Sequence, residues 1–165
     1  MEKSKIVLWG VVLLIIVGVL FYLNKPNASD AYPELDNNAF GKSESSGEVL
    51  AGNSGAMYKE FNQADYEQAL SENKKILLYF YANWCPICVA EQPAIKGTFD
   101  ELDNENIIGF RVNYKDSATD NYEKSLAEEF GITYQHTKVI IVNGEQSLKS
   151  LENWDKDKYI EELNK

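Results

Sequence analysis

The two cysteines of this chain, Cys85 and Cys88, lie two residues apart, between an apolar segment and a segment with a helical pattern. Residues 76–82 are apolar throughout, as expected for a strand that is buried on both faces of a sheet. A strand that delivers Cys85 to the first turn of a helix places its sulfur beside unpaired backbone N–H groups, which favour the thiolate. The spacing therefore favours redox chemistry, with Cys85 as the nucleophile and Cys88 resolving a mixed disulfide.

Two other interpretations of the cysteine pair are weaker. A structural zinc site needs four Cys or His ligands, and this chain has two cysteines and one histidine. A purely structural disulfide across so short a loop removes little chain entropy, and a domain of this size can bury its own core. We expect no bound cofactor.

The N-terminal part of the chain differs from the part that carries the cysteines. Residues 6–23 carry no charge, and such a run is near the lower limit of about 17–20 residues for a membrane-spanning helix. Lys3 and Lys5 precede the run, whereas acidic residues dominate after Lys25. The positive-inside rule therefore places residues 1–5 in the cytoplasm, residues 6–23 in the membrane as a single-pass anchor, and the remaining chain on the extracytoplasmic side.

A cleaved signal peptide is the alternative for this apolar run. The run is longer than the usual apolar region of a signal peptide and ends in Phe21, Tyr22 and Leu23 instead of small residues. Only a weak cleavage signal follows, at residues 29–31. We therefore favour the anchor, and under either interpretation the domain is exported.

Residues 24–56 are predicted to form a flexible polar linker. This range contains Pro26, Pro33 and two stretches rich in glycine and serine, and it shows no sustained periodicity. Such a linker would hold a domain away from the bilayer and let it reach partners near the membrane.

The net charge of −10 bears on partners. A strongly acidic chain is repelled by phosphate backbones, so we expect no nucleic-acid partner. The charge by itself indicates no substrate.

Residues 57–165 alternate strand and helix signals, as one small α/β domain does. Asp120 and Glu123 form a capping box for a helix that Gly131 stops, and Asn143-Gly144 is a strong two-residue hairpin signal. Strands are predicted at 58–61, 76–82, 107–113, 137–142 and 145–151, and helices at 65–70, after Cys85, at 120–130 and from 154 to the C-terminus.

This order resembles the thioredoxin fold, an α/β fold with a central mixed sheet flanked by helices. Residues 82–88, Ala-Asn-Trp-Cys-Pro-Ile-Cys, with Pro93 after them, resemble the family pattern of Ala-x-Trp-Cys-x-x-Cys and a proline within the active-site helix. The resemblance covers residues 58–165 and implies a thiol–disulfide oxidoreductase whose partners are protein thiols and disulfides. It also implies that Trp84, Pro86, Ile87 and Pro93 surround the catalytic cysteines.

A finer resemblance points to the membrane-anchored, extracytoplasmic TlpA/ResA-like branch. The sequence from Cys88 through Glu91 to Pro93 resembles the C-x-x-E-x-P ending of that branch, although its typical larger insertion is not apparent. The glutamate of such proteins lies near the cysteines and assists proton movement, which implies this role for Glu91 and a membrane electron donor as a partner. The alternative is that Glu91 is a solvated helix residue.

Two positions depart from the family pattern. Thioredoxins carry a buried aspartate six residues before the first cysteine, where this chain has Tyr79, and a phenol with an ordinary pKa of about 10 is a poor replacement at neutral pH. Glu91 is then the better candidate for the proton-transferring carboxylate. Residues 131–137 align with a pattern that ends in cis-Pro-Thr, but His136 occupies the proline position. A non-proline cis bond costs about 3 kcal/mol, so a trans bond is expected here.

The resemblance implies that the backbone of Gln135, His136 and Thr137 pairs with a substrate chain beside the cysteines. Three roles stay open for the imidazole of His136. When protonated it would stabilise a Cys85 thiolate, when neutral it could complete a Cys2His metal site, and it could also be a loop residue with no ligand.

Three functions follow from these patterns. The leading hypothesis is a membrane-tethered oxidoreductase. The second is a tethered copper carrier using Cys85, Cys88 and His136, similar in function to Sco-type copper chaperones, since thiolates suit Cu(I). The third is a redox-inert binding module, against which the intact C-x-x-C argues. The sequence indicates neither the direction of electron flow nor the substrate.

Overall fold

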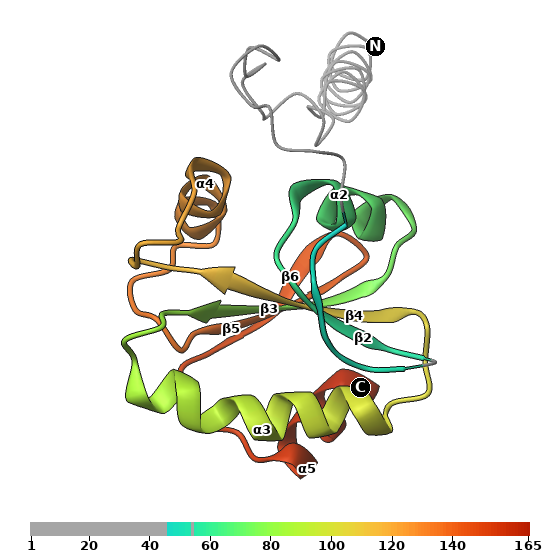
Figure 1. Ribbon diagram of the computed structural model, residues 1–165. Coiled ribbons are helices and arrows are strands. Elements are labelled where there is room, and N and C mark those ends of the chain that lie inside the picture. Colours follow the sequence, from blue (N-terminus) through green and yellow to red (C-terminus); the bar gives the residue numbers. More distant parts are fainter. Residues whose placement is uncertain (1–45, 54) are drawn as a thin grey trace, which may run out of the picture. The chain divides into compact units, whose positions relative to one another are not determined.

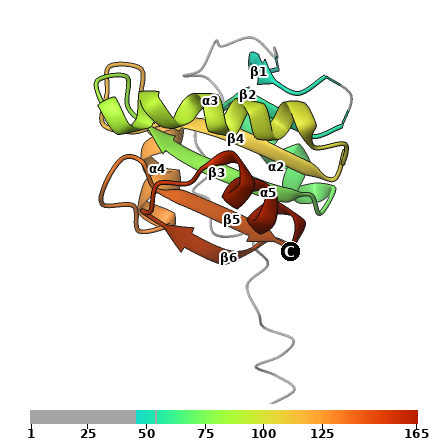
Figure 2. The ribbon, with the colours of Figure 1, turned by 90° about the horizontal axis from the view of Figure 1, so that it is seen from below.

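The computed structural model describes residues 46–53 and 55–165, which form a six-stranded mixed sheet with helices on both faces (Figure 1). The strand order is β1-β2-β4-β3-β5-β6. In chain order the elements are β1 (Val49–Ala51), β2 (Met57–Glu60), α2 (Gln63–Ser71), β3 (Lys75–Tyr81), α3 (Pro86–Glu101), β4 (Ile107–Asn113), α4 (Asn121–Glu129), β5 (Lys138–Val142), β6 (Glu145–Ser150) and α5 (Lys156–Asn164). Helices α2 and α4 cover one face, and α3 and α5 lie beside each other on the opposite face (Figures 1 and 2).

Strand β3 is the centre of the sheet, parallel to β4 and antiparallel to β5. Its apolar residues alternate between two cores, as the period of a strand requires. Leu77 and Tyr79 belong to the core beneath α3 and α5, whereas Ile76, Leu78 and Phe80 belong to the core beneath α2 and α4. The prediction of a strand buried on both faces is confirmed. Packing against both cores holds β3 in place and so sets the position of the cysteines that follow it.

The local signals at the ends of α4 and between β5 and β6 form as predicted. Asp120 accepts a hydrogen bond from the backbone of Glu123, whose side chain accepts one from the Asp120 N–H, so the capping box is complete. Asn143 and Gly144 both adopt positive φ, at 54° and 77°, as a tight hairpin between these strands requires.

The predicted start of the domain needs correction. The linker prediction for residues 24–56 is wrong at its C-terminal end, because β1 pairs antiparallel with β2 and Ala56 is fully buried. A three-residue edge strand is too short to show a periodicity that sequence reasoning can detect. Gly47 is also part of the domain, since its N–H donates a hydrogen bond to the Asp65 carboxylate at 2.8 Å.

The predicted membrane anchor at residues 6–23 and the linker up to residue 45 lie outside the described residues. Within residues 46–53 and 55–165, no helix has both the length and the apolar character needed to cross a bilayer.

Gly109 on β4 offers a test of the core beneath α3. A Cβ at this position would lie 2.5 Å from the Phe99 ring and 2.9 Å from Tyr58, two buried rings stacked at 5.4 Å. We expect Gly109→Ala to lower the free energy of unfolding by about 1–3 kcal/mol through overpacking. Gly97→Ala on α3 is the control, because its Cβ would meet only the flexible Lys156 side chain at 3.5 Å. This variant should gain about 0.5–1 kcal/mol. Urea denaturation measures both, and equal effects would contradict the packing argument.

Candidate redox site

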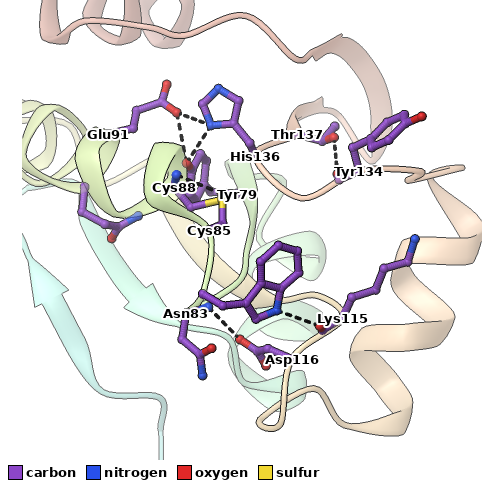
Figure 3. The surroundings of a disulfide bond; sticks show 12 residues. Tyr79, Asn83, Cys85, Cys88, Glu91, Lys115, Asp116, Tyr134, His136 and Thr137 are labelled. Atoms are coloured by element: carbon purple, nitrogen blue, oxygen red, sulfur yellow. Dashed lines mark hydrogen bonds and ion pairs between the residues drawn. A yellow bond between two sulfur atoms is a disulfide. The ribbon is translucent and has the colours of Figure 1, made fainter.

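Cys85 and Cys88 form a disulfide at the N-terminus of α3 (Figure 3). Cys85 is the N-cap residue, and its sulfur accepts a hydrogen bond from the Cys88 N–H at 3.1 Å. Pro86 follows at the first helical position, where its missing N–H leaves no donor unpaired. Cys88 is fully buried and Cys85 is 3% exposed. The cysteine pair therefore lies at a strand–helix junction, as predicted. The structure describes the pair in its oxidised, disulfide-bonded form.

Exposed apolar side chains lie on the segments next to the disulfide. Trp84 precedes Cys85, Ile87 lies between the two cysteines, and Tyr134 lies on the loop that leads to His136 (Figure 3). They are 55%, 51% and 64% exposed, respectively. The Trp84 indole N–H donates to the Lys115 carbonyl at 3.0 Å, which holds the ring against the loop after β4. We call Trp84, Ile87 and Tyr134 the apolar rim.

Glu91 lies one turn of α3 after Cys88 and is 6% exposed. The interpretation of Glu91 as a solvated helix residue is wrong. Five groups from the sheet, two loops and α5 surround its carboxylate. They are Tyr79 Oη at 3.0 Å, His136 Nδ1 at 2.8 Å, Lys138 Nζ at 2.9 Å, the Trp154 N–H at 2.8 Å and Tyr159 Oη at 2.9 Å.

This environment determines which groups carry charge. Burial alone would raise the pKa of Glu91, but hydrogen bonds from His136, the Trp154 N–H and Lys138 lower it to about 2. Burial, followed by the charge of Glu91, raises the pKa of Tyr79 above its ordinary value. Tyr79 is therefore a neutral donor to Glu91, and Glu91 is a carboxylate at neutral pH.

Lys138, on β5, is the residue of this site that sequence reasoning missed. It is fully buried and donates to both oxygens of Glu91, at 2.9 and 3.1 Å, and to the Glu152 carbonyl at 2.5 Å. Its Nζ also lies 5.5 Å from the centre of the Tyr79 ring. The available signal was a lysine within the apolar strand predicted at 137–142, because a buried ammonium requires a partner.

The loop before β5 takes a form that differs from the predicted family pattern. No cis peptide occurs among the described residues, so the bond before His136 is trans as expected, and His136 has a φ of 72°. The His136 N–H donates to the Phe80 carbonyl at 2.6 Å, and the Thr137 carbonyl accepts from the Phe80 N–H at 2.9 Å. These two groups therefore bond within the domain. The pairing of the Gln135, His136 and Thr137 backbone with a substrate stays a prediction. The His136 N–H and the Thr137 carbonyl already form hydrogen bonds with Phe80.

The His136 ring faces Glu91 and does not join the cysteines as a ligand (Figure 3). Its Nδ1 is 2.8 Å from Glu91 and its Nε2 is 3.4 Å from Lys138 Nζ. Across the described part of the chain, no group of three or more His, Cys, Asp or Glu side chains is arranged to hold a metal ion. The structure therefore does not assemble the Cys2His site of the copper-carrier hypothesis.

Comparisons with known proteins agree with the fold. The Thioredoxin family model matches residues 57–165. A thioredoxin from Mycoplasmoides gallisepticum is 31% identical over 62 residues, which is 38% of this chain and 62% of that relative's length. Trxlp from Edwardsiella tarda has a TM-score of 0.54 at 21% identity, covering 64% of this chain and 97% of its own. A thioredoxin from Aeropyrum pernix has a TM-score of 0.53 at 16% identity, covering 73% and 95%.

The fold and the site together define an α/β domain with a disulfide centre at a helix N-terminus. Since the family match spans more than half of the chain, the protein belongs to the thioredoxin family.

The low pKa of Glu91 makes the stability of the domain depend on pH. A pKa of about 2, against an ordinary value of 4.5, stabilises the fold above pH 4.5, and this contribution is lost as the pH falls from 4.5 towards 2. We expect Glu91→Gln to lower the free energy of unfolding by about 3 kcal/mol at pH 7. The deficit should shrink at pH 3.

Urea denaturation at pH 7, 5 and 3 checks this expectation. Glu101→Gln, on the same helix, is the control, because Glu101 is 58% exposed where it pairs with Lys156. A deficit for Glu91→Gln that is as large at pH 3 as at pH 7 would refute the assignment of Glu91 as a buried carboxylate.

Proposed function

We propose that this chain is a thiol–disulfide oxidoreductase that is tethered to a membrane and acts on protein substrates on the extracytoplasmic side. The observation that carries the proposal is the Cys85–Cys88 disulfide at the start of α3, where the Cys88 N–H already contacts the Cys85 sulfur. The same N–H and the helix dipole favour a Cys85 thiolate once the disulfide is reduced.

The reaction takes place in two exchanges. The Cys85 thiolate attacks one sulfur of a substrate disulfide, whose S–S bond breaks, and the other substrate sulfur leaves as a thiolate. The Cys88 thiolate then attacks Cys85 Sγ, which re-forms the Cys85–Cys88 disulfide and releases the second substrate thiolate. Two electrons pass from the protein to the substrate, and each released thiolate takes a proton from solvent according to its pKa. The reverse sequence oxidises a substrate dithiol.

The surroundings of the disulfide suit a polypeptide substrate. The apolar rim of Trp84, Ile87 and Tyr134 offers exposed apolar area beside a sulfur that is itself nearly buried. An exposed apolar patch of this kind is typical of a protein-binding surface. A substrate segment would pack on the rim and bring its disulfide to Cys85.

Membrane tethering rests on the sequence of the N-terminal part. The charge-free run at residues 6–23, with Lys3 and Lys5 before it, supports a single-pass anchor with the domain outside the cytoplasm. Glu91 adds support for a TlpA/ResA-like relationship, because it is buried on α3 one turn after Cys88, and that branch implies a glutamate near the cysteines. A membrane electron donor would keep the pair reduced.

A trapping experiment tests the redox proposal. We expect Cys88→Ser in the full chain to accumulate mixed disulfides through Cys85, since the residue that resolves them is absent. Cys85→Ser is the matched control and should accumulate at least tenfold fewer adducts. Non-reducing electrophoresis followed by reduction identifies the trapped proteins. Equal trapping by both variants, or by neither, would count against Cys85 as the nucleophile.

A topology experiment tests the tether separately. Protease added to sealed right-side-out membrane vesicles that contain the full chain should digest the domain, and the same treatment of inside-out vesicles should leave it intact. Immunoblotting for the C-terminus measures the outcome. Protection in right-side-out vesicles would reverse the proposed orientation, and recovery of the full chain in the soluble fraction would refute the anchor.

A further inference from the structure

A fully buried ammonium lies beside the acid of the redox site. The side chain of Lys138 is 0% exposed and that of Glu91 is 4% exposed, with Lys138 Nζ at 2.9 and 3.1 Å from the two carboxylate oxygens. A carboxylate or an ammonium buried alone would be neutralised by a shift of its pKa. The ammonium and the carboxylate therefore each stabilise the charged form of the other.

We propose that Lys138 is a positioning residue for the disulfide chemistry, which holds Glu91 as a carboxylate and His136 as the Nδ1–H tautomer. The inference rests on the oxidoreductase function proposed above and assigns a role within that same site.

The contacts of His136 with Glu91 and Lys138 favour one tautomer of its ring. The ammonium has three protons and no lone pair, so every polar atom that it contacts must accept. Its acceptors are Glu91, the Glu152 carbonyl and, at 3.4 Å, His136 Nε2. Nε2 therefore carries the lone pair and Nδ1 carries the proton, which Nδ1 donates to Glu91 at 2.8 Å.

The other groups around Glu91 supply no permanent charge. Tyr79 from β3 and Tyr159 from α5 donate as neutral phenols, and the remaining donor is the backbone N–H of Trp154. Lys138 is the one lysine or arginine that pairs with this carboxylate within the described residues. Removal of Lys138 would leave a carboxylate with hydrogen bonds and no counter-charge.

Two donors to Glu91, the phenols of Tyr79 and Tyr159, belong to the buried core that contains the cysteines. Cys85, Cys88 and Tyr79 belong to one buried cluster that also includes Trp154 and Tyr159. In such a medium an uncompensated carboxylate would oppose the formation of a nearby thiolate. The Lys138 ammonium cancels most of this effect, so the thiolate of the reduced protein faces a neutral pair.

The test uses the reduced full chain in detergent and measures the rate of Cys85 alkylation from pH 5 to 9. We expect Lys138→Met to slow alkylation at pH 7 by about tenfold, equivalent to a rise of one unit in the thiol pKa. It should also add a second inflection to the profile as Glu91 titrates. Lys149→Met, an exposed lysine on β6, is the matched control and should follow the wild type.

A double variant separates positioning from packing. Lys138→Met with Glu91→Gln leaves no unpaired buried charge, so it should fold even where Lys138→Met does not. If Lys138 acts through Glu91, this double variant lacks the second inflection that Lys138→Met shows. A folded Lys138→Met with the wild-type profile, or a double variant that keeps the second inflection, would overturn the inference.

The reduction potential of the wild type distinguishes this failure from failure of the proposed function. Equilibration with graded thiol–disulfide buffers should give a reversible two-electron transition of the Cys85–Cys88 pair. Absence of that transition refutes the oxidoreductase itself. A reversible transition together with an unchanged Lys138→Met profile refutes only the role of Lys138.

Discussion

The buried pair of Glu91 and Lys138 is the interaction on which the architecture of the site depends. Two full charges removed from water are stable only when their geometry is good and their remaining hydrogen-bonding groups are satisfied. Here the carboxylate contacts donors from β3, β5, α5 and two loops, and the ammonium uses its remaining protons on the Glu152 carbonyl and His136 Nε2. Each of these elements must reach its final position before the pair is complete, so the site and the tertiary fold form together.

The C-terminal helix illustrates this dependence. Tyr159 on α5 is fully buried and donates to Glu91, and Trp154 in the preceding loop packs against it with ring centres 5.0 Å apart. An element that ends the chain therefore supplies donors to the acid beside the N-terminus of α3. Burial, followed by the charge of Glu91, raises the pKa of Tyr159, so this phenol is a protonated donor to Glu91 at neutral pH.

The order of elements from β2 to α5 could be predicted because its signals are local. The apolar run of β3, the capping box of Asp120 and Glu123, and the Asn143-Gly144 turn each act over a few residues. The cysteine pair was also evident, since its chemistry depends on its own spacing and its place after a strand. Lys138 was not, because its burial depends on a partner 47 residues earlier in the chain. Strand β1 could not be predicted for a related reason, since it forms by pairing with β2 and has no sequence pattern of its own.

Where the family pattern has an aspartate on the central strand, this chain has Tyr79, and its buried acid is Glu91 on α3. The acid and the disulfide are therefore joined through one helix. Glu91 lies on α3 itself, one turn after Cys88, so the disulfide and the carboxylate belong to the same short helical segment. The donors to that carboxylate come instead from the sheet, α5 and their loops. Any shift of the first turns of α3 when the disulfide is reduced would therefore stretch the hydrogen bonds from Tyr79, Lys138 and Tyr159 to Glu91. Because each such bond to a charged group contributes about 1.5–3 kcal/mol, the network opposes that shift. It thereby opposes movement of the helical segment that carries the cysteines.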